Sequence, residues 1–297
     1  MKKLLKLLGG LVALLVLVAV ALLAWLYAQG RQPLKTGAEY VAMGSSFAAG
    51  PGLGDNEPGS PAFCSRSTRN YAHRVAASLG LSLSDVSCGG ATTSHILRGG
   101  QLFQGSQIDA VGPATKLVTV TIGGNDINYI GGLGSWACQT GPDHVFPLWR
   151  PLACMKFKVG SPEDLQKTRA ALIEIAALVH QRAPQAQLIF VDYATVLPPA
   201  GSCPERLPLS EAQMAEGRSV AMALNRITAE AADSGGALLV KASELTAAHD
   251  ICAADSWIVP FRISVNPFAT PALHPTEASM RAVAEEIIAR VRRGVAQ

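Results

Sequence analysis

A serine in a small-residue turn and a late histidine are the side chains of this sequence that best suit nucleophilic catalysis. Ser46 lies in the motif GSSFAAG, directly after a short apolar run, and His274 lies in LHPT, near the end of the chain. A serine hydroxyl is a poor nucleophile until a neighbouring base removes its proton. Taken alone, each motif is also typical of an ordinary turn or a structural histidine, so the two gain meaning only if the fold brings them together.

Two further motifs could stabilise negative charge during acyl transfer. Gly90 lies in CGGATT and Asn125 lies in GGND, and each motif again follows an apolar run. Small residues let a backbone N–H approach a ligand closely, and an asparagine amide can point at an oxyanion. Turns rich in Gly, Asn and Asp are common after any strand, so these motifs too depend on their setting.

The elements that must position these residues alternate along the chain. Five apolar or β-branched runs predict strands: Tyr40 to Met43, Leu81 to Ser87, Leu117 to Ile122, Gln187 to Val191, and Ala237 to Val240. Helical patterns lie between them, and Ser161-Pro162-Glu163 is typical of a helix start. Strands separated by helices indicate a parallel sheet covered on both faces, which binds ligands beyond the carboxyl ends of its strands. The stretch from Asn128 to Gly160 is expected to be irregular. The loop over 129–160 is a candidate acyl-binding wall or, alternatively, a disulfide-pinned cover over the core.

The order of the four motifs resembles the four blocks of the SGNH (GDSL-like) hydrolase superfamily, over roughly residues 38–295. The resemblance implies a three-layer α/β/α sandwich with a five-stranded parallel sheet in flavodoxin-like order. It also implies roles for four residues: Ser46 attacks an acyl carbonyl, His274 is the base, and the N–H groups of Ser46 and Gly90 form the oxyanion hole with the Asn125 amide.

Two positions depart from the family pattern. Ser45 replaces the acid of the family's GDS motif, and Pro271 stands where the family usually has an aspartate three residues before the histidine. We therefore expect a dyad in which the backbone carbonyl of Pro271 orients His274, because a neutral carbonyl can still fix the imidazole tautomer. The acids that could replace the missing aspartate are, as alternatives, Asp192, Asp126 and Asp250.

The six cysteines form no C-x-x-C pair, and an even number of cysteines behind an export signal predicts three disulfides. The residues alone leave about 15 connectivities open. The chain is most similar to the secreted, three-disulfide streptomycete-type esterase branch of the superfamily. That resemblance implies the pairs Cys64–Cys88, Cys138–Cys154 and Cys203–Cys252.

The N-terminus predicts a signal anchor or a signal peptide over residues 1–30, followed by a linker over 31–38 and the hydrolase domain over 39–297. An uncharged run from Leu7 to Tyr27 follows three lysines, and at about 1.5 Å per residue it can cross a bilayer core of about 30 Å. The leading lysines favour a cytoplasmic N-terminus. The domain is therefore expected to be extracytoplasmic, either membrane-anchored or secreted.

Composition and motifs argue against two classes of function, nucleic-acid binding and metal-dependent catalysis. The net charge of +3 without a basic stripe argues against a nucleic-acid partner, and the six dispersed histidines without HExxH argue against a metal site. We expect a serine ester hydrolase, esterase- or lipase-like, that needs no cofactor, acts as a monomer and takes ester or lipid-like small molecules. The alternatives are a cell-envelope acyltransferase using the same site and a catalytically inactive envelope-binding module.

Overall fold

Five short strands form one parallel sheet in the computed structural model, which describes residues 2–140, 154, 158–262, 266 and 269–295. The sheet order is β2-β1-β3-β4-β5, and every neighbouring pair is parallel. The strands are β1 Tyr40–Gly44, β2 Leu83–Asp85, β3 Leu117–Thr121, β4 Gln187–Val191 and β5 Leu238–Val240. Each predicted run overlaps one of these strands, with β1 extending one residue beyond its run to Gly44. The order is the flavodoxin-like one that the family resemblance implies.

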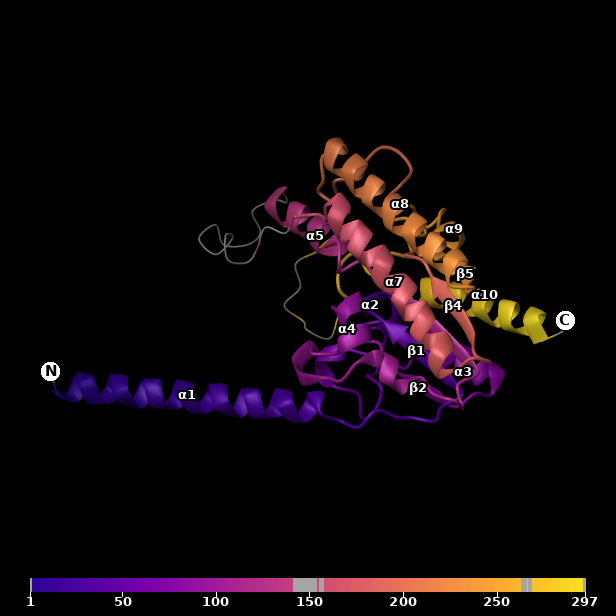
Figure 1. Cartoon of the computed structure of the whole chain (residues 1–297). Helices are drawn as coiled ribbons and strands as arrows, with labels where there is room; N and C mark the ends of the chain where they lie inside the picture. The colour runs from indigo at the N-terminus through magenta and orange to yellow at the C-terminus, as the bar shows by residue number, and fades with distance from the viewer. Residues whose placement is uncertain (1, 141–153, 155–157, 263–265, 267–268, 296–297) are drawn as a thin grey trace.

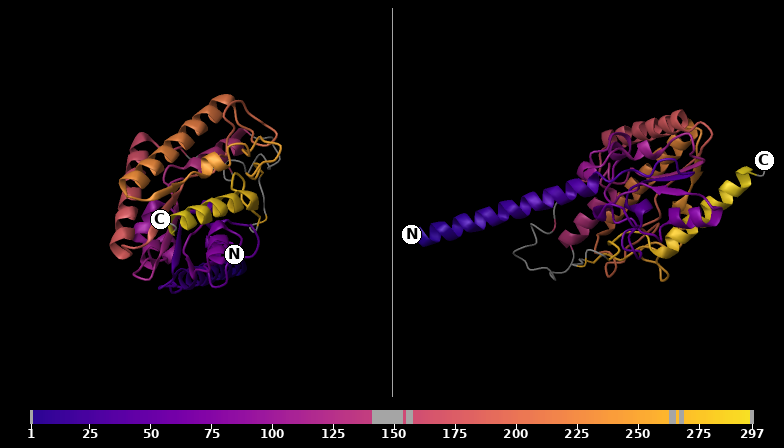
Figure 2. Two further views of the ribbon diagram at one scale, coloured as in Figure 1. Left: turned by 90° about the vertical axis from the view of Figure 1, so that its right-hand side faces the viewer. Right: turned by 90° about the horizontal axis from the view of Figure 1, so that it is seen from below.

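Helices cover both faces of this sheet (Figures 1 and 2). One face packs against α4 Thr93–Arg98, α5 Tyr129–Thr140, α7 Pro162–Arg182 and α8 Glu211–Ser234. The other face packs against α3 Tyr71–Leu79 and α10 Glu277–Val295. Successive strand residues point to opposite faces, so Val41 and Met43 join the first core while Tyr40 and Ala42 join the second.

Short elements complete the connections at both edges of the sheet. They are α2 Ser46–Ala49, α9 Ala242–Leu245, and the 3-10 turns η1 Ala62–Cys64, η2 Gln101–Phe103 and η3 Gln107–Ala110. Helices α7 and α8 both begin with a capping box, at Ser161 and Ser210. Those caps satisfy backbone N–H groups that would otherwise lack partners.

The stretch after Asn128 is less irregular than its composition suggests. Helix α5 occupies Tyr129–Thr140 despite three glycines, because Tyr129, Leu133 and Ala137 recur at helical spacing and are buried. The expectation of an irregular loop from 128 was therefore wrong for these residues. Most of the remaining stretch, including Phe146 and Trp149, lies outside the described residues.

Helix α1 spans Lys2–Gly30 and extends away from the domain (Figure 1). From Lys6 to Gly30 it is long and apolar enough to cross a membrane, and its position near the N-terminus is also that of a signal sequence. The side chains from Leu7 to Tyr27 are exposed along almost the whole helix. Its uniform apolar character is therefore consistent with a signal sequence.

Candidate active site

The turn that carries Ser46 is held tightly against the neighbouring strand. Gly44 ends β1 with φ of 147°, and a Cβ there would come within 2.4 Å of the carbonyl oxygen of Thr121. Ser45 is extended, its N–H donates to that same Thr121 oxygen at 2.9 Å, and Ser46 begins α2. A glycine is thus required at 44, and the sharp turn after it leaves Ser46 at the carboxyl edge of the sheet.

His274 lies directly against this serine. Its Nε2 is 2.8 Å from the Ser46 Oγ, although 228 positions separate the two residues in sequence. The segment around His274 is pinned by main-chain hydrogen bonds: the Val259 N–H donates to the His274 carbonyl at 3.0 Å, and the Leu273 N–H donates to the Val259 carbonyl at 2.8 Å. The fold therefore brings together the two residues that the motifs single out.

The carbonyl that orients the imidazole is that of Ala272, so the expectation of Pro271 was wrong. The Nδ1 of His274 lies 2.9 Å from the Ala272 oxygen. Leu273 has φ of 65°, so the chain reverses between the two residues and turns the Ala272 oxygen back toward the ring. A carbonyl can only accept, which places the ring proton on Nδ1 and leaves Nε2 free to accept the proton of Ser46.

Burial lowers the pKa of His274 below its usual value, and the hydrogen bond to the Ala272 carbonyl opposes that shift. Burial disfavours the charged imidazolium. The imidazole is therefore in its neutral, proton-accepting form at neutral pH.

The other two predicted oxyanion-hole residues, Gly90 and Asn125, follow the ends of β2 and β3, and the Asn125 side chain bonds to the residue after Gly90. The Asn125 Nδ2 donates to the Ala91 carbonyl at 2.8 Å, directly beside Gly90. An amide NH₂ has two hydrogens, so a second one remains for a ligand. Gly90 has φ of 76° and is exposed, a conformation that favours glycine.

Tyr193, which the sequence analysis did not single out, connects the serine turn to the GGND motif. Its hydroxyl accepts from the Gly124 N–H at 2.9 Å and lies 3.1 Å from the Ser45 Oγ. A Cβ at Gly124 would come within 2.6 Å of the tyrosine ring, so this glycine permits the close approach. Burial raises the pKa of Tyr193 to about 12, which keeps it a neutral phenol. Its position at the end of the fourth predicted strand was the available signal.

The three candidate acids have other partners. Asp192 accepts from the N–H of Ser243 at 2.8 Å and from its Oγ at 2.7 Å. Asp126 accepts from the N–H and hydroxyl of Thr93, and Asp250 accepts from the N–H of Cys252. Burial raises the pKa of Asp192 to about 6. Within the described residues these contacts place all three acids in structural roles at helix starts and turns.

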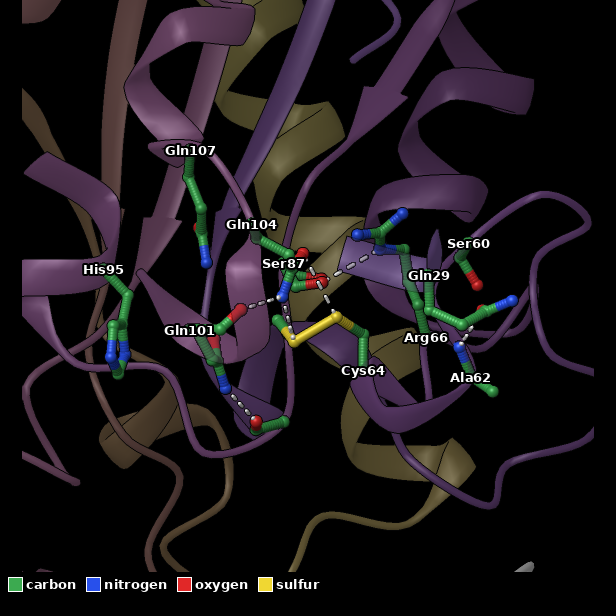
Figure 3. The surroundings of a disulfide bond; sticks show 12 residues. Gln29, Ser60, Ala62, Cys64, Arg66, Ser87, His95, Gln101, Gln104 and Gln107 are labelled. Atoms are coloured by element: carbon green, nitrogen blue, oxygen red, sulfur yellow. Dashed lines mark hydrogen bonds between the residues drawn. A yellow bond between two sulfur atoms is a disulfide. The ribbon is translucent and has the colours of Figure 1, made fainter. Parts of the chain in front are cut away.

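The cysteines pair as the resemblance implies: Cys64–Cys88, Cys138–Cys154 and Cys203–Cys252. The first bridge ties η1 to the residue immediately before Gly89-Gly90 (Figure 3). The Gly89 N–H also donates to the Cys64 carbonyl at 3.0 Å, so the predicted oxyanion segment is held from behind. In the described part of the chain, no group of three or more His, Cys, Asp or Glu side chains could hold a metal ion.

Comparisons with known proteins show the family to which the chain belongs. Residues 42–282 match the GDSL-like lipase/acylhydrolase family. Lipase 2 of Streptomyces coelicolor is 34% identical over 83% of this chain and 83% of its own length. The lipase of Streptomyces rimosus is 29% identical over 78% of this chain and 81% of its own.

Solved structures show the same fold. The extracellular lipase of Streptomyces rimosus superposes with a TM-score of 0.66 at 26% identity, covering 84% of this chain and 98% of that one. Phospholipase A1 of Streptomyces albidoflavus superposes with a TM-score of 0.65 at 23% identity, with the same coverage. A parallel sheet with a serine and a histidine in contact at its carboxyl edge is the arrangement of a serine hydrolase. The chain belongs to the GDSL-like lipase/acylhydrolase family and is a carboxylic ester hydrolase.

Proposed function

We propose that Ser46 and His274 form the catalytic dyad of a membrane-anchored lipid esterase. The observation that carries the proposal is the 2.8 Å contact between the Ser46 Oγ and the His274 Nε2, with Nδ1 held by the Ala272 carbonyl. A base within hydrogen-bond reach of the nucleophile, itself oriented by a third group, is the requirement for activating a serine. The lipid-like substrate class follows from the lipases to which the chain is similar.

In the first half-reaction, the Ser46 Oγ attacks the acyl carbonyl carbon while the His274 Nε2 takes its proton. The oxyanion that forms accepts hydrogen bonds from the N–H groups of Ser46 and Gly90 and from the free hydrogen of the Asn125 amide. When the intermediate collapses, the imidazolium returns its proton to the leaving alcohol oxygen, and the acyl group remains on Ser46.

In the second half-reaction, His274 removes a proton from water, whose oxygen attacks the acyl carbon. The same donors hold the second oxyanion. Collapse releases the carboxylic acid as the proton returns to the Ser46 Oγ, and the enzyme regains its starting state. No carboxylate is needed at any step, although a neutral carbonyl stabilises the imidazolium less than an aspartate would, so modest turnover is expected.

The test is a set of substitutions measured on p-nitrophenyl esters from acetate to palmitate. Ser46→Ala and His274→Ala should each abolish nearly all turnover, and the double variant should be little worse, because the two residues act as a unit. Asn125→Ala should lower turnover by about 10²–10³-fold, as expected for one oxyanion donor. Near-normal turnover in Ser46→Ala would show that the site assignment is wrong.

The same active site could transfer the acyl group to an alcohol instead of water. A competition assay with glycerol distinguishes the two, because a transferase forms glyceryl ester at the expense of free acid. Labelling of Ser46 by an active-site serine probe would exclude the inactive envelope-binding module. The maintained Ser46–His274 contact, despite the loss of both family acids, favours a catalytic site over an inactive module.

The proposed organisation of the chain has three parts. Residues 1–30 anchor the protein in the membrane, residues 31–38 link the anchor to the catalytic domain, and residues 39–297 form that domain outside the cytoplasm. Three lysines at the N-terminal end of α1 support this orientation. The domain is proposed to act as a monomer, without a cofactor or nucleic-acid partner.

A further inference from the structure

The C-terminal end of α1 is docked on the catalytic domain. Gly30 packs so closely on η2 that a Cβ would come within 2.1 Å of the Leu102 carbonyl oxygen. The ring centroids of Tyr27 and Phe103 are 5.6 Å apart, and the Gln29 Oε1 accepts from the Ala62 N–H at 3.1 Å (Figure 3). These contacts fix where the helix leaves the domain. We call Gly30, Gln29, Ala62, Leu102 and Phe103 the anchor dock.

The anchor dock is connected directly to the predicted oxyanion segment. Ala62 belongs to η1, which ends at Cys64 and is bridged to Cys88, the residue before Gly89. From the other side, the Gln101 Nε2 donates to the Gly89 carbonyl at 2.7 Å. Gln101 immediately precedes the two residues that meet α1. The η1 and η2 sides of the dock therefore hold the segment that contains Gly90 through contacts that do not involve α1.

The aromatic residues of α1 set the depth at which the dock would meet a bilayer. Trp25 and Tyr27 lie at the end of the apolar run, where an interfacial aromatic belt is expected. Phe103 contacts Tyr27, so it lies at the same level. Leu102 and Phe103 are each 42% exposed and have φ of 44° and 71°. An exposed pair of large apolar side chains suits a membrane interface better than water.

The direction of α1 gives the orientation of the active site. Figure 1 shows that α1 leaves the domain on the side where α2, α4 and α5 lie, and that α10 runs to the opposite side. The right-hand view of Figure 2, seen from below, again shows α1 (indigo) and α10 (yellow) extending to opposite sides of the domain. Because α2 and α4 follow the carboxyl ends of β1 and β2, the catalytic edge of the sheet faces the direction in which α1 extends.

We propose that the catalytic edge faces the outer leaflet of the bilayer that α1 enters, and that the substrate is an ester-bearing lipid of that same bilayer. The proposal rests on the hydrolase and anchor proposed above and adds an orientation and a source of substrate. Leu102 and Phe103 contact the leaflet beside the site, and the dock keeps Ser46 turned toward it. Hydrolysis is then favoured for lipids in the enzyme's own membrane over lipids in other vesicles.

The experiment uses the full chain in phosphatidylcholine vesicles. A non-exchanging, fluorogenic phosphatidylcholine is placed either in the enzyme's own vesicles or in separate enzyme-free vesicles, and p-nitrophenyl butyrate reports turnover of a soluble ester. We expect the wild type to hydrolyse the lipid at least about tenfold faster in its own vesicles, because the docked helix supplies both proximity and orientation. Equal rates in the two settings would overturn the proposal.

Gly30→Val separates docking from chemistry. It places a side chain against the Leu102 carbonyl, so lipid hydrolysis in the enzyme's own vesicles should fall by about tenfold while butyrate turnover stays within about twofold. Gly10→Val is the matched control, because a Cβ at Gly10 meets nothing within 4 Å and both rates should be unchanged. Unaltered lipid hydrolysis in Gly30→Val would contradict the role of the dock.

A labelling measurement covers the case in which Gly30→Val fails to fold. A photoreactive benzoylphenylalanine at Leu102 should crosslink to vesicle lipid, whereas the same residue at Met222, 66% exposed on α8, should not. Equal labelling at both positions would contradict the orientation. Butyrate turnover without lipid hydrolysis would overturn only this proposal. The absence of both activities in correctly folded protein would instead refute the proposed hydrolase.

Discussion

In the described part of the chain, the proposed base His274 is hydrogen-bonded to a backbone carbonyl rather than to a carboxylate, and this sets its expected pH dependence. Burial is the larger influence on its pKa and lowers it, while the bond to the Ala272 carbonyl acts in the opposite direction. A general base must be unprotonated, so activity falls as the pH drops through that pKa. Because the pKa lies below the usual value, activity should persist to a lower pH than for an ordinary histidine.

We predict that kcat/KM falls on the acid side of its pH profile with a midpoint below about pH 6.5, the pKa of an unperturbed histidine. It is measured with p-nitrophenyl butyrate in buffers from about pH 4 to about pH 9, across the range in which histidine titrates. A midpoint above the unperturbed value would imply a hidden carboxylate that stabilises the imidazolium. Circular dichroism at each pH separates loss of activity from unfolding.

Asp192 provides the second test at the residue scale. Its carboxyl accepts from Ser243 rather than facing His274, so Asp192→Asn should leave turnover within about tenfold, whereas loss of a true triad acid costs about 10⁴-fold. Its pKa is raised by burial to about 6 from 3.8. The stability contributed by its protonated form is complete below pH 3.8 and is lost as the pH rises to about 6.

Because ionisation of Asp192 lowers the stability of the fold as the pH rises, a residue that cannot ionise should not make the protein less stable at neutral pH. The amide cannot ionise and can still bond to Ser243, so the variant should unfold at a temperature at least as high as the wild type at neutral pH. Thermal unfolding monitored by circular dichroism measures this. A collapse of turnover with folding intact would show that a relocated triad had been mistaken for a dyad.

At the scale of elements, the disulfides differ in what they hold. Cys64–Cys88 closes a separation of 24 residues and supports the segment before Gly90, whereas Cys203–Cys252 closes 49 residues and joins two loops elsewhere. In the chain-entropy model each bridge stabilises by about 3–4 kcal/mol, slightly more for the longer loop. Stability and activity should therefore respond differently to their removal.

Cys64→Ser with Cys88→Ser should lower both the unfolding temperature and kcat, and Cys203→Ser with Cys252→Ser should lower the unfolding temperature at least as much with little change in kcat. Differential scanning calorimetry and butyrate kinetics below the unfolding range provide the two readouts. Equal effects on kcat would show that the first bridge has no particular influence on the oxyanion segment.

The strands could be predicted from the sequence, whereas one helix could not. All five strands could be predicted because each overlaps an apolar or β-branched run. Three of the four motifs could be placed because they follow such runs, whereas the His274 motif could be placed only before the last helix. Helix α5 could not be predicted, because its glycines disfavour a helix and only tertiary packing offsets that. Leu133 of α5 fits against Gly217 of α8, where a Cβ would come within 2.7 Å of its side chain.

The roles of Ala272 and Tyr193 were beyond sequence reasoning for a similar reason. Which carbonyl meets the imidazole depends on the φ of Leu273, a backbone angle that no side-chain pattern reports for a leucine. In the sequence, Tyr193 is indistinguishable from any buried residue at a strand end. Its role depends on the contacts of its hydroxyl with Ser45 and Gly124, which only the structure shows. Serine in place of the family acid therefore has a partner that the motif does not reveal.

At the scale of the whole molecule, the apolar helix and the catalytic domain are expected to remain one chain. The residue two before Ala28 is Leu26 rather than a small one, and Gly30 and Gln29 contact Leu102 and Ala62 within the anchor dock. A peptidase would have to reach a segment that is packed against the domain. Both observations support the proposed uncleaved anchor over a removed signal peptide.

The prediction is that the mature protein keeps its N-terminus and resists extraction from membranes by alkaline carbonate. Replacing Leu15 and Leu17 by Arg should release it, because each charge at the centre of a spanning helix costs about 2.5–3.5 kcal/mol on the insertion scale. Deleting residues 1–30 should give a soluble domain that still hydrolyses p-nitrophenyl butyrate, since Ser46 and His274 contact each other within the domain. Immunoblotting of the pellet and supernatant, with N-terminal sequencing of the wild type, measures both outcomes. Recovery of wild-type protein that begins after residue 28 in the soluble fraction would show that the segment is a cleaved signal peptide.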